Sequence, residues 1–142
     1  MKTYWDVALD DYSGACANVE INQYRVAVYL FQQFAEKGAK YLLECRDPKH
    51  EKLRSHKIEE ILSAYDNSIK AEEMHVWAVY LSSFYFNTRY PGDNYADIEE
   101  PQVARARKYA DEFMAYYEQE IGKMKNIDIS GTCSSLRPAA TL

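Results

Sequence analysis

The sequence predicts an all-α fold, an antiparallel up-and-down bundle of four or five helices. Apolar side chains recur every three or four residues through most of the chain, which is the spacing of one helix face. No segment of useful length alternates apolar and polar residues as a half-buried strand would. With 142 residues, the chain is long enough to bury a sizeable core as one domain.

The first two helices are expected over residues 4–19 and 23–45. The second is apolar over a wide arc, which predicts that it lies at the centre of the bundle. Gly38 lies inside it, where glycine costs about 1 kcal/mol relative to alanine, so we expect a close helix crossing there. Glu36 and Lys40 are four residues apart in the order that favours an ion pair along a helix.

The middle of the chain is predicted to form a loop and two further helices. Residues 46–54 are polar and contain a proline, which is typical of a loop. Ser55 is a suitable N-cap for a helix over about 56–68. Another apolar stripe predicts a helix over about 71–87.

A loop over residues 88–100 is expected to precede the last helix. Pro101 suits a first helical position, and the apolar stripe continues from there to about residue 122. The remaining residues, 123–142, contain glycine, proline, serine and threonine but no stripe. The domain is therefore predicted to span 1–122, with 123–142 as a loosely ordered tail.

Composition narrows the classes of function. Hydrophobic residues make up 47% of the chain and charged residues 27%, as in an ordinary folded domain. No run approaches the roughly 18 apolar residues of a membrane span, and the N-terminus has no apolar signal region, so a cytoplasmic protein without membrane contact is expected. The three cysteines are widely spaced and no two histidines have ligand spacing, so no metal or other cofactor is expected. The net charge of -5 argues against broad nucleic-acid binding, but a local basic groove remains compatible with it.

The aromatic helical pattern stops at residues 87–95. A proline and a glycine break the helix there, and Arg89 lies at the break between aromatic residues. A guanidinium group carries five donors that suit phosphate or carboxylate. Arg89 is therefore a candidate ligand contact, and the alternative is a structural pair with Asp93, Asp97 or a helix-terminal carbonyl.

Three segments resemble the HEPN family, the higher eukaryote and prokaryote nucleotide-binding domain. Residues 29–43 contain a Gln-Gln-x-x-Glu-Lys-x-x-Lys core between Gln32 and Lys40. Residues 55–62 are similar to the family's Ser/Thr-His helix start, and residues 88–91 read Thr-Arg-Tyr-Pro, similar to the signature before the last helix. The order and spacing also match, and the resemblance covers about residues 4–121.

The resemblance implies a helical bundle that often forms dimers. In many members an Arg-x(4–6)-His motif from each chain cuts RNA without a metal. Here Asn94 or Tyr95 stands where that histidine would follow Arg89. Asparagine cannot move a proton near neutral pH, and the unperturbed pKa of tyrosine is about 10, so efficient catalysis is not expected. His56 is the remaining candidate for an acid or base if the fold brings it to Arg89.

The leading hypothesis is a HEPN domain that binds a nucleotide or RNA in a cleft around Arg89. One alternative is a toxin-like, metal-independent ribonuclease that uses Arg89 and His56. Another is a homodimeric interaction module that pairs with a small nucleotidyltransferase, which many bacterial members have as a neighbour. The candidate ligand contacts are Arg89, Tyr90, Asn94, His56, Lys37 and Gln33.

Other residues are open to a functional and a structural interpretation. Lys37 and Lys40 can attract phosphate beside Gln33, or form a solvated face with Glu36 and Glu44. The basic run at residues 105–108 can bind RNA or be solvated in the same way. Three tyrosines can stack on a base or pack against the protein: Tyr85, Tyr90 and Tyr95.

Overall fold

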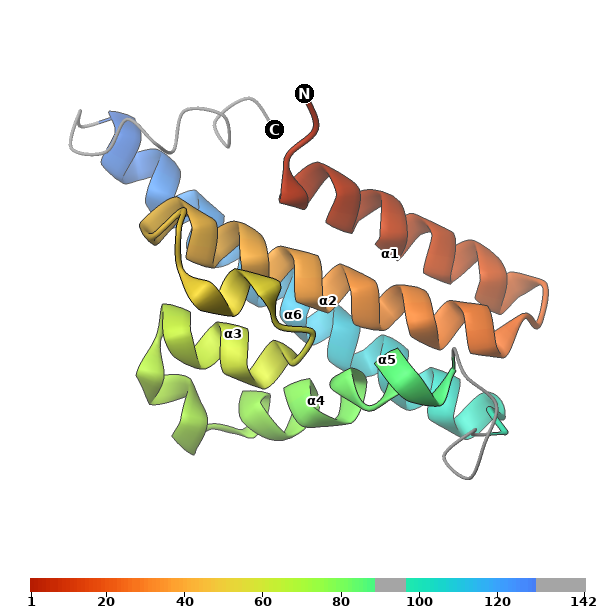
Figure 1. The fold of residues 1–142 in the computed structure, drawn as a ribbon. Helices are drawn as coiled ribbons and strands as arrows, with labels where there is room; N and C mark the ends of the chain where they lie inside the picture. The colour runs from red at the N-terminus through yellow and green to blue at the C-terminus, as the bar shows by residue number, and fades with distance from the viewer. Residues whose placement is uncertain (89–96, 130–142) are drawn as a thin grey trace.

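The computed structural model describes residues 1–88 and 97–129. All regular secondary structure assigned within these ranges is helical (Figure 1). The all-α prediction is confirmed. No helix among the described residues is long and apolar enough to cross a membrane. The helices are α1 (Tyr4–Glu20), α2 (Tyr24–Arg46), α3 (Ile58–Tyr65), α4 (Glu73–Ser82), α5 (Phe84–Asn87) and α6 (Glu100–Ile129), with short 3-10 helices η1 (Glu51–Arg54) and η2 (Asn67–Ala71).

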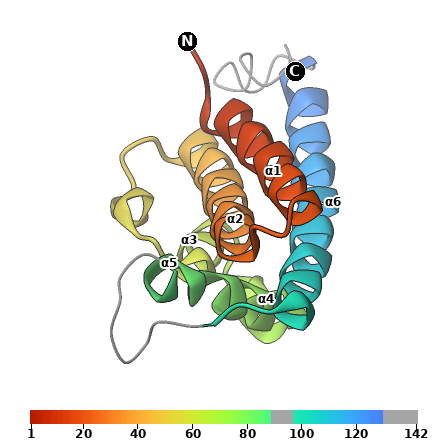
Figure 2. The same cartoon turned by 90° about the vertical axis from the view of Figure 1, so that its right-hand side faces the viewer.

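Helix α2 lies at the centre of the bundle, as its wide apolar arc predicts. It packs against α1 and α6 and also against the shorter helices α3, α4 and α5. Figure 1 shows α2 between α1 and the α3–α4 segment, and Figure 2 shows the same arrangement viewed along α2, with α6 running beside α1 and α2. Two different faces of α2 are therefore covered by two different sets of helices.

An aromatic core joins α1, α2 and α6. The ring centroid of Tyr117 lies 5.9 Å from that of Trp5 and 5.8 Å from that of Phe34. The Tyr117 hydroxyl donates a hydrogen bond of 2.5 Å to the carbonyl oxygen of Ala35. A Cβ atom on Gly38 would overlap the Tyr117 ring, so glycine is what lets α6 approach α2 this closely. The close helix crossing expected at Gly38 is confirmed.

Helix α3 begins later than the sequence indicated. Its N-cap is Lys57 and not Ser55, because the Ser55 hydroxyl instead accepts a hydrogen bond from the Lys57 backbone in a local turn. The first free N–H of α3, that of Ile58, donates to the Ser82 hydroxyl of α4 at 2.8 Å. A side chain from another helix thus replaces the expected local cap.

Two other boundaries differ from the expected ones. The single helix expected over 71–87 is divided at Ser83 into α4 and α5. Helix α6 continues to Ile129, beyond the expected end near residue 122, because Met124 extends its buried stripe by another turn. Residues 130–142 lie outside the described residues, so a loosely ordered tail remains a prediction for them.

Candidate functional site

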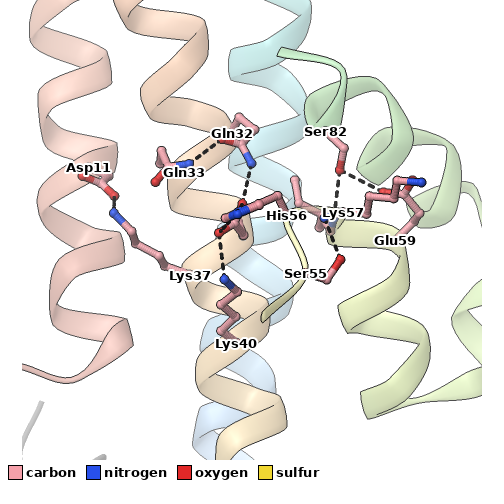
Figure 3. Close-up of polar contacts among 12 residues, drawn as sticks. Asp11, Gln32, Gln33, Lys37, Lys40, Ser55, His56, Lys57, Glu59 and Ser82 are labelled. Carbon is pink, nitrogen blue, oxygen red and sulfur yellow. Dashed lines mark hydrogen bonds and ion pairs between the residues drawn. The ribbon is translucent and has the colours of Figure 1, made fainter. Parts of the chain in front are cut away.

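The face of α2 that is turned away from the aromatic core carries a row of buried polar side chains (Figure 3). Gln32, Glu36 and Lys40 are only 0%, 3% and 7% exposed. They share a face because residues four apart on a helix lie one above the other. The Glu36 carboxylate accepts a hydrogen bond of 2.9 Å from the Gln32 amide and forms an ion pair of 3.0 Å with Lys40.

His56 joins this row from the connection before α3. Its Nδ1 atom lies 3.4 Å from the Glu36 carboxylate. Its ring stacks on the Tyr85 ring of α5, with 4.1 Å between centroids and 12° between planes. The side chain is 46% exposed, so His56 contacts the buried Glu36 carboxylate and still reaches the surface. We call Gln32, Gln33, Glu36, Lys40 and His56 the polar cluster.

The start of α3 holds the backbone next to His56 in place. The Ser82 hydroxyl of α4 accepts a hydrogen bond from the Ile58 N–H and donates one of 2.9 Å to the Glu59 carboxylate. Figure 3 shows this link beside His56. Ser82 therefore ties the segment that carries His56 to the helix that leads into α5.

Two of the candidate contacts predicted from sequence belong to the polar cluster. His56 is one of them, and Gln33 is the other, since its amide donates a hydrogen bond of 2.7 Å to the Gln32 carbonyl oxygen. Lys37 is not part of the cluster, because it pairs with Asp11 of α1 at 2.6 Å, across α2 from His56 (Figure 3).

The remaining candidate contacts, Arg89, Tyr90 and Asn94, lie outside the described residues, as does Tyr95. The chain enters their segment after Thr88, directly following α5. Thr88 is buried, and its hydroxyl donates a hydrogen bond of 2.6 Å to the Phe84 carbonyl oxygen. The described structure thus fixes the point from which that segment departs, three residues after Tyr85.

Sequence reasoning missed the role of Glu36 and of its two α2 partners. A Glu-Lys pair four residues apart is typical of an exposed helix face, and Lys40 was open to that interpretation. The burial of both residues rules out a solvated Glu36–Lys40 pair. The signal that could have found them was the Gln-Gln-x-x-Glu-Lys-x-x-Lys motif itself, which contains Gln32, Glu36 and Lys40 together.

Other candidate residues take part in packing. Arg105 lies over the Tyr80 ring, 4.4 Å from its centroid, and donates a hydrogen bond of 2.9 Å to the Tyr109 hydroxyl. Tyr85 stacks on His56, as a packing interpretation predicts. Among the residues that the structure describes, no group of three or more histidine, cysteine or acidic side chains is placed to hold a metal ion.

Comparison with known families identifies the class of protein. The profile of the HEPN domain matches residues 1–121, so this chain belongs to the HEPN family. Membership confirms the resemblance read from the three motifs and supports a function related to nucleotides or RNA at the level of the family. No curated protein and no solved structure gives a significant match.

Proposed function

We propose that this HEPN domain binds a nucleotide or RNA through His56 and through Arg89 of the segment that follows Thr88. The observation that carries the proposal is the position of His56, which is half-exposed between the buried Glu36 carboxylate and the Tyr85 ring. A side chain held at the surface by contacts on two sides is pre-organised for a ligand, because little conformational freedom remains to be lost on binding.

The chemistry of the two side chains is complementary. A guanidinium group at Arg89 can contact phosphate oxygens through two parallel hydrogen bonds. His56 presents its second ring nitrogen, Nε2, on the side away from Glu36. A ring nitrogen in this position can contact a ribose or a phosphate. Tyr90, Asn94 and Gln33 remain proposed contacts beside them. Lys37 is engaged by Asp11, so the proposal does not depend on it.

Calorimetric titration of the full chain with adenine and guanine nucleotides and with short RNAs tests the proposal. We expect binding that Arg89→Ala and His56→Ala each weaken by about tenfold, which corresponds to roughly 1.4 kcal/mol. Lys123→Ala is the matched control, because it removes an exposed positive charge from α6 and should leave binding unchanged. Absence of binding by every ligand, or full binding by Arg89→Ala, would overturn the proposal.

The contact between Glu36 and His56 favours a second candidate, a metal-independent ribonuclease. A carboxylate that faces one nitrogen of a histidine ring orients the ring, which assists proton transfer at the other nitrogen. Against this candidate, no histidine follows Arg89 at the family's spacing. Incubation with RNA in EDTA separates the two functions. Cleavage that is lost in His56→Ala supports the enzyme, whereas intact RNA at high protein concentration supports binding alone.

We further propose that the chain is cytoplasmic and forms a homodimer, with a small nucleotidyltransferase as a potential partner. Val76 and Val79 of α4 are exposed apolar side chains that suit such contacts. Light scattering of the purified protein measures the mass of the assembly. A monomeric mass at all concentrations, without a co-purified partner, would contradict this part of the proposal.

A further inference from the structure

The Glu36 carboxylate sets the direction of the hydrogen bonds around it. An ionised carboxylate only accepts hydrogen bonds, so every polar group that faces it has to donate. Lys40 and the Gln32 amide already do so, at 3.0 Å and 2.9 Å. The Glu36 side chain is only 4% exposed, which leaves water little access to it.

The orientation of the two glutamines follows from this carboxylate. Gln32 has to turn its NH2 group toward Glu36, so its carbonyl oxygen faces Gln33. Gln33 then turns its own NH2 group inward, toward that oxygen, at 2.7 Å. The carbonyl oxygen of Gln33 is left as the end of the chain of hydrogen bonds. One buried charge therefore orders two neutral side chains in sequence.

The Glu36 carboxylate also fixes the role of His56. Its Nδ1 atom faces the Glu36 carboxylate at 3.4 Å, so Nδ1 is the nitrogen that carries a proton. In the neutral ring, Nε2 is then an unprotonated acceptor, and the shape of the ring turns it away from Glu36. Stacking on Tyr85 keeps the plane of the ring in this position.

The ion pair within the cluster leaves His56 free to be neutral. Lys40 already balances the charge of Glu36, and both side chains are buried, at 8% and 4% exposed. A neutral His56 ring therefore leaves no buried charge unpaired.

We infer that Glu36 is a positioning residue, which holds neutral His56 in its Nδ1–H tautomer and so presents Nε2 as a hydrogen-bond acceptor to the ligand. The part of this inference that concerns a ligand rests on the proposed function, whereas the tautomer is a property of the free protein. An outward acceptor suits a hydroxyl donor such as that of a ribose better than a phosphate oxygen, which also accepts. His56 would then contact the sugar of the ligand.

The tautomer can be measured directly by nuclear magnetic resonance on protein labelled with 15N in its histidines, without a ligand. Nδ1 and Nε2 have different chemical shifts and proton couplings when protonated and when bare. Above the pH at which the ring loses its charge, we expect wild-type His56 to carry its proton on Nδ1. We expect Glu36→Gln to lose this preference, because an amide can also donate to Nδ1. A wild-type proton on Nε2 would overturn the inference, even if Glu36→Gln does not fold.

Asp11→Asn is the matched control, since it makes the same carboxylate-to-amide change on α1, where Asp11 pairs with Lys37. It should leave the His56 signals unchanged, and an equal effect of both variants would contradict a specific role for Glu36.

A binding readout separates this inference from the proposed function. If wild-type His56 is in the Nδ1–H form and no nucleotide or RNA binds, the proposed function fails and the positioning role stands. If a ribonucleotide binds, Glu36→Gln should weaken binding by about tenfold at most, as expected for the loss of one hydrogen bond between neutral groups. The matching deoxyribonucleotide should bind the wild-type protein less tightly, and equal binding of the two would overturn the assignment of His56 to the sugar.

Discussion

The two buried faces of α2 differ in what their burial achieves. Toward α1 and α6, Phe34 and Gly38 meet the rings of Trp5 and Tyr117, and the contacts are almost entirely apolar. Toward His56, the buried groups are two amides and an ion pair. Apolar burial stabilises a fold directly, whereas a buried ion pair rarely adds stability relative to apolar residues of similar size. The comparison shows that burial alone does not distinguish a core from a site, and that the chemistry of the buried groups does.

Truncation of the aromatic face should have the largest effect. Phe34→Ala removes a fully buried ring from the centre of the core, and we expect a loss of about 3–5 kcal/mol in the free energy of unfolding. Denaturant titration measures the loss. Histidine signals of any remaining folded protein should still report the Nδ1–H form of His56. A loss below about 1 kcal/mol would mean that the ring is not the main support of this face.

On the polar face, single and double substitutions should differ. Lys40→Met leaves the buried Glu36 charge without its ion-pair partner, and we expect a loss of about 3 kcal/mol in the free energy of unfolding. The double variant Glu36→Gln, Lys40→Met removes both charges and keeps an acceptor for the buried Gln32 amide, so it should unfold near the wild-type denaturant concentration. If the double variant is as unstable as the single one, the ion pair stabilises the fold and the contrast between the faces is wrong.

The close helix crossing offers a smaller test. Gly38→Ala places a methyl group against the Tyr117 ring, which its hydrogen bond to Ala35 holds in place, and overpacking of this kind costs about 1–3 kcal/mol. Gly122→Ala in α6 is the control. Apart from the adjacent residues and the backbone of its own helix, no atom lies within 4 Å of the added carbon. It should instead stabilise the protein by about 0.5–1 kcal/mol through helix propensity. If the two substitutions change the free energy of unfolding equally, the close helix crossing does not explain the glycine at position 38.

The buried tyrosines predict a loss of stability at high pH. Burial is the main cause that raises the pKa of Tyr117, and burial likewise raises the pKa values of Tyr65 and Tyr116. The folded state holds these protons more tightly than the unfolded state, in which the pKa is about 10. Their contribution to stability is therefore complete below about pH 10 and is lost as the pH rises toward the folded values, at up to about 1.4 kcal/mol per residue and pH unit. Phenolate absorbance and helix content, followed together, should change in one transition. Full ionisation of the tyrosines with intact helices would contradict the expected loss of stability.

The sequence predicted the elements whose cause is local. Periodic apolar residues place α1 and α2 to within one residue at either end, and Gly38 revealed the helix crossing. It did not predict that Ser82 would cap α3, because that contact joins residues 24 positions apart. The end of α6 was missed for a different reason, since one more buried residue, Met124, was enough to extend the helix.

The sequence predicted only part of the candidate site, because the rest depends on contacts between helices. The family motifs indicated His56 and Gln33, and both lie in the polar cluster. Lys37 and Lys40 are only three positions apart in the same motif, but α1 approaches one of them and the cluster contains the other. Spacing along one helix cannot say which neighbour covers each face. Only the packing of α1 on one side, and of the α3–α5 segment on the other, separates the two lysines.

The central claim is that the face with the polar cluster binds a ligand and the aromatic face supports the fold. Chemical-shift mapping of the labelled full chain, titrated with a nucleotide and with a short RNA, tests it most directly. The account predicts that the shifted signals gather at His56, Glu36, Tyr85 and Thr88, with the signals of Trp5 and the aromatic core unchanged. Shifts confined to α1 and α6, or no shifts with either ligand, would contradict it.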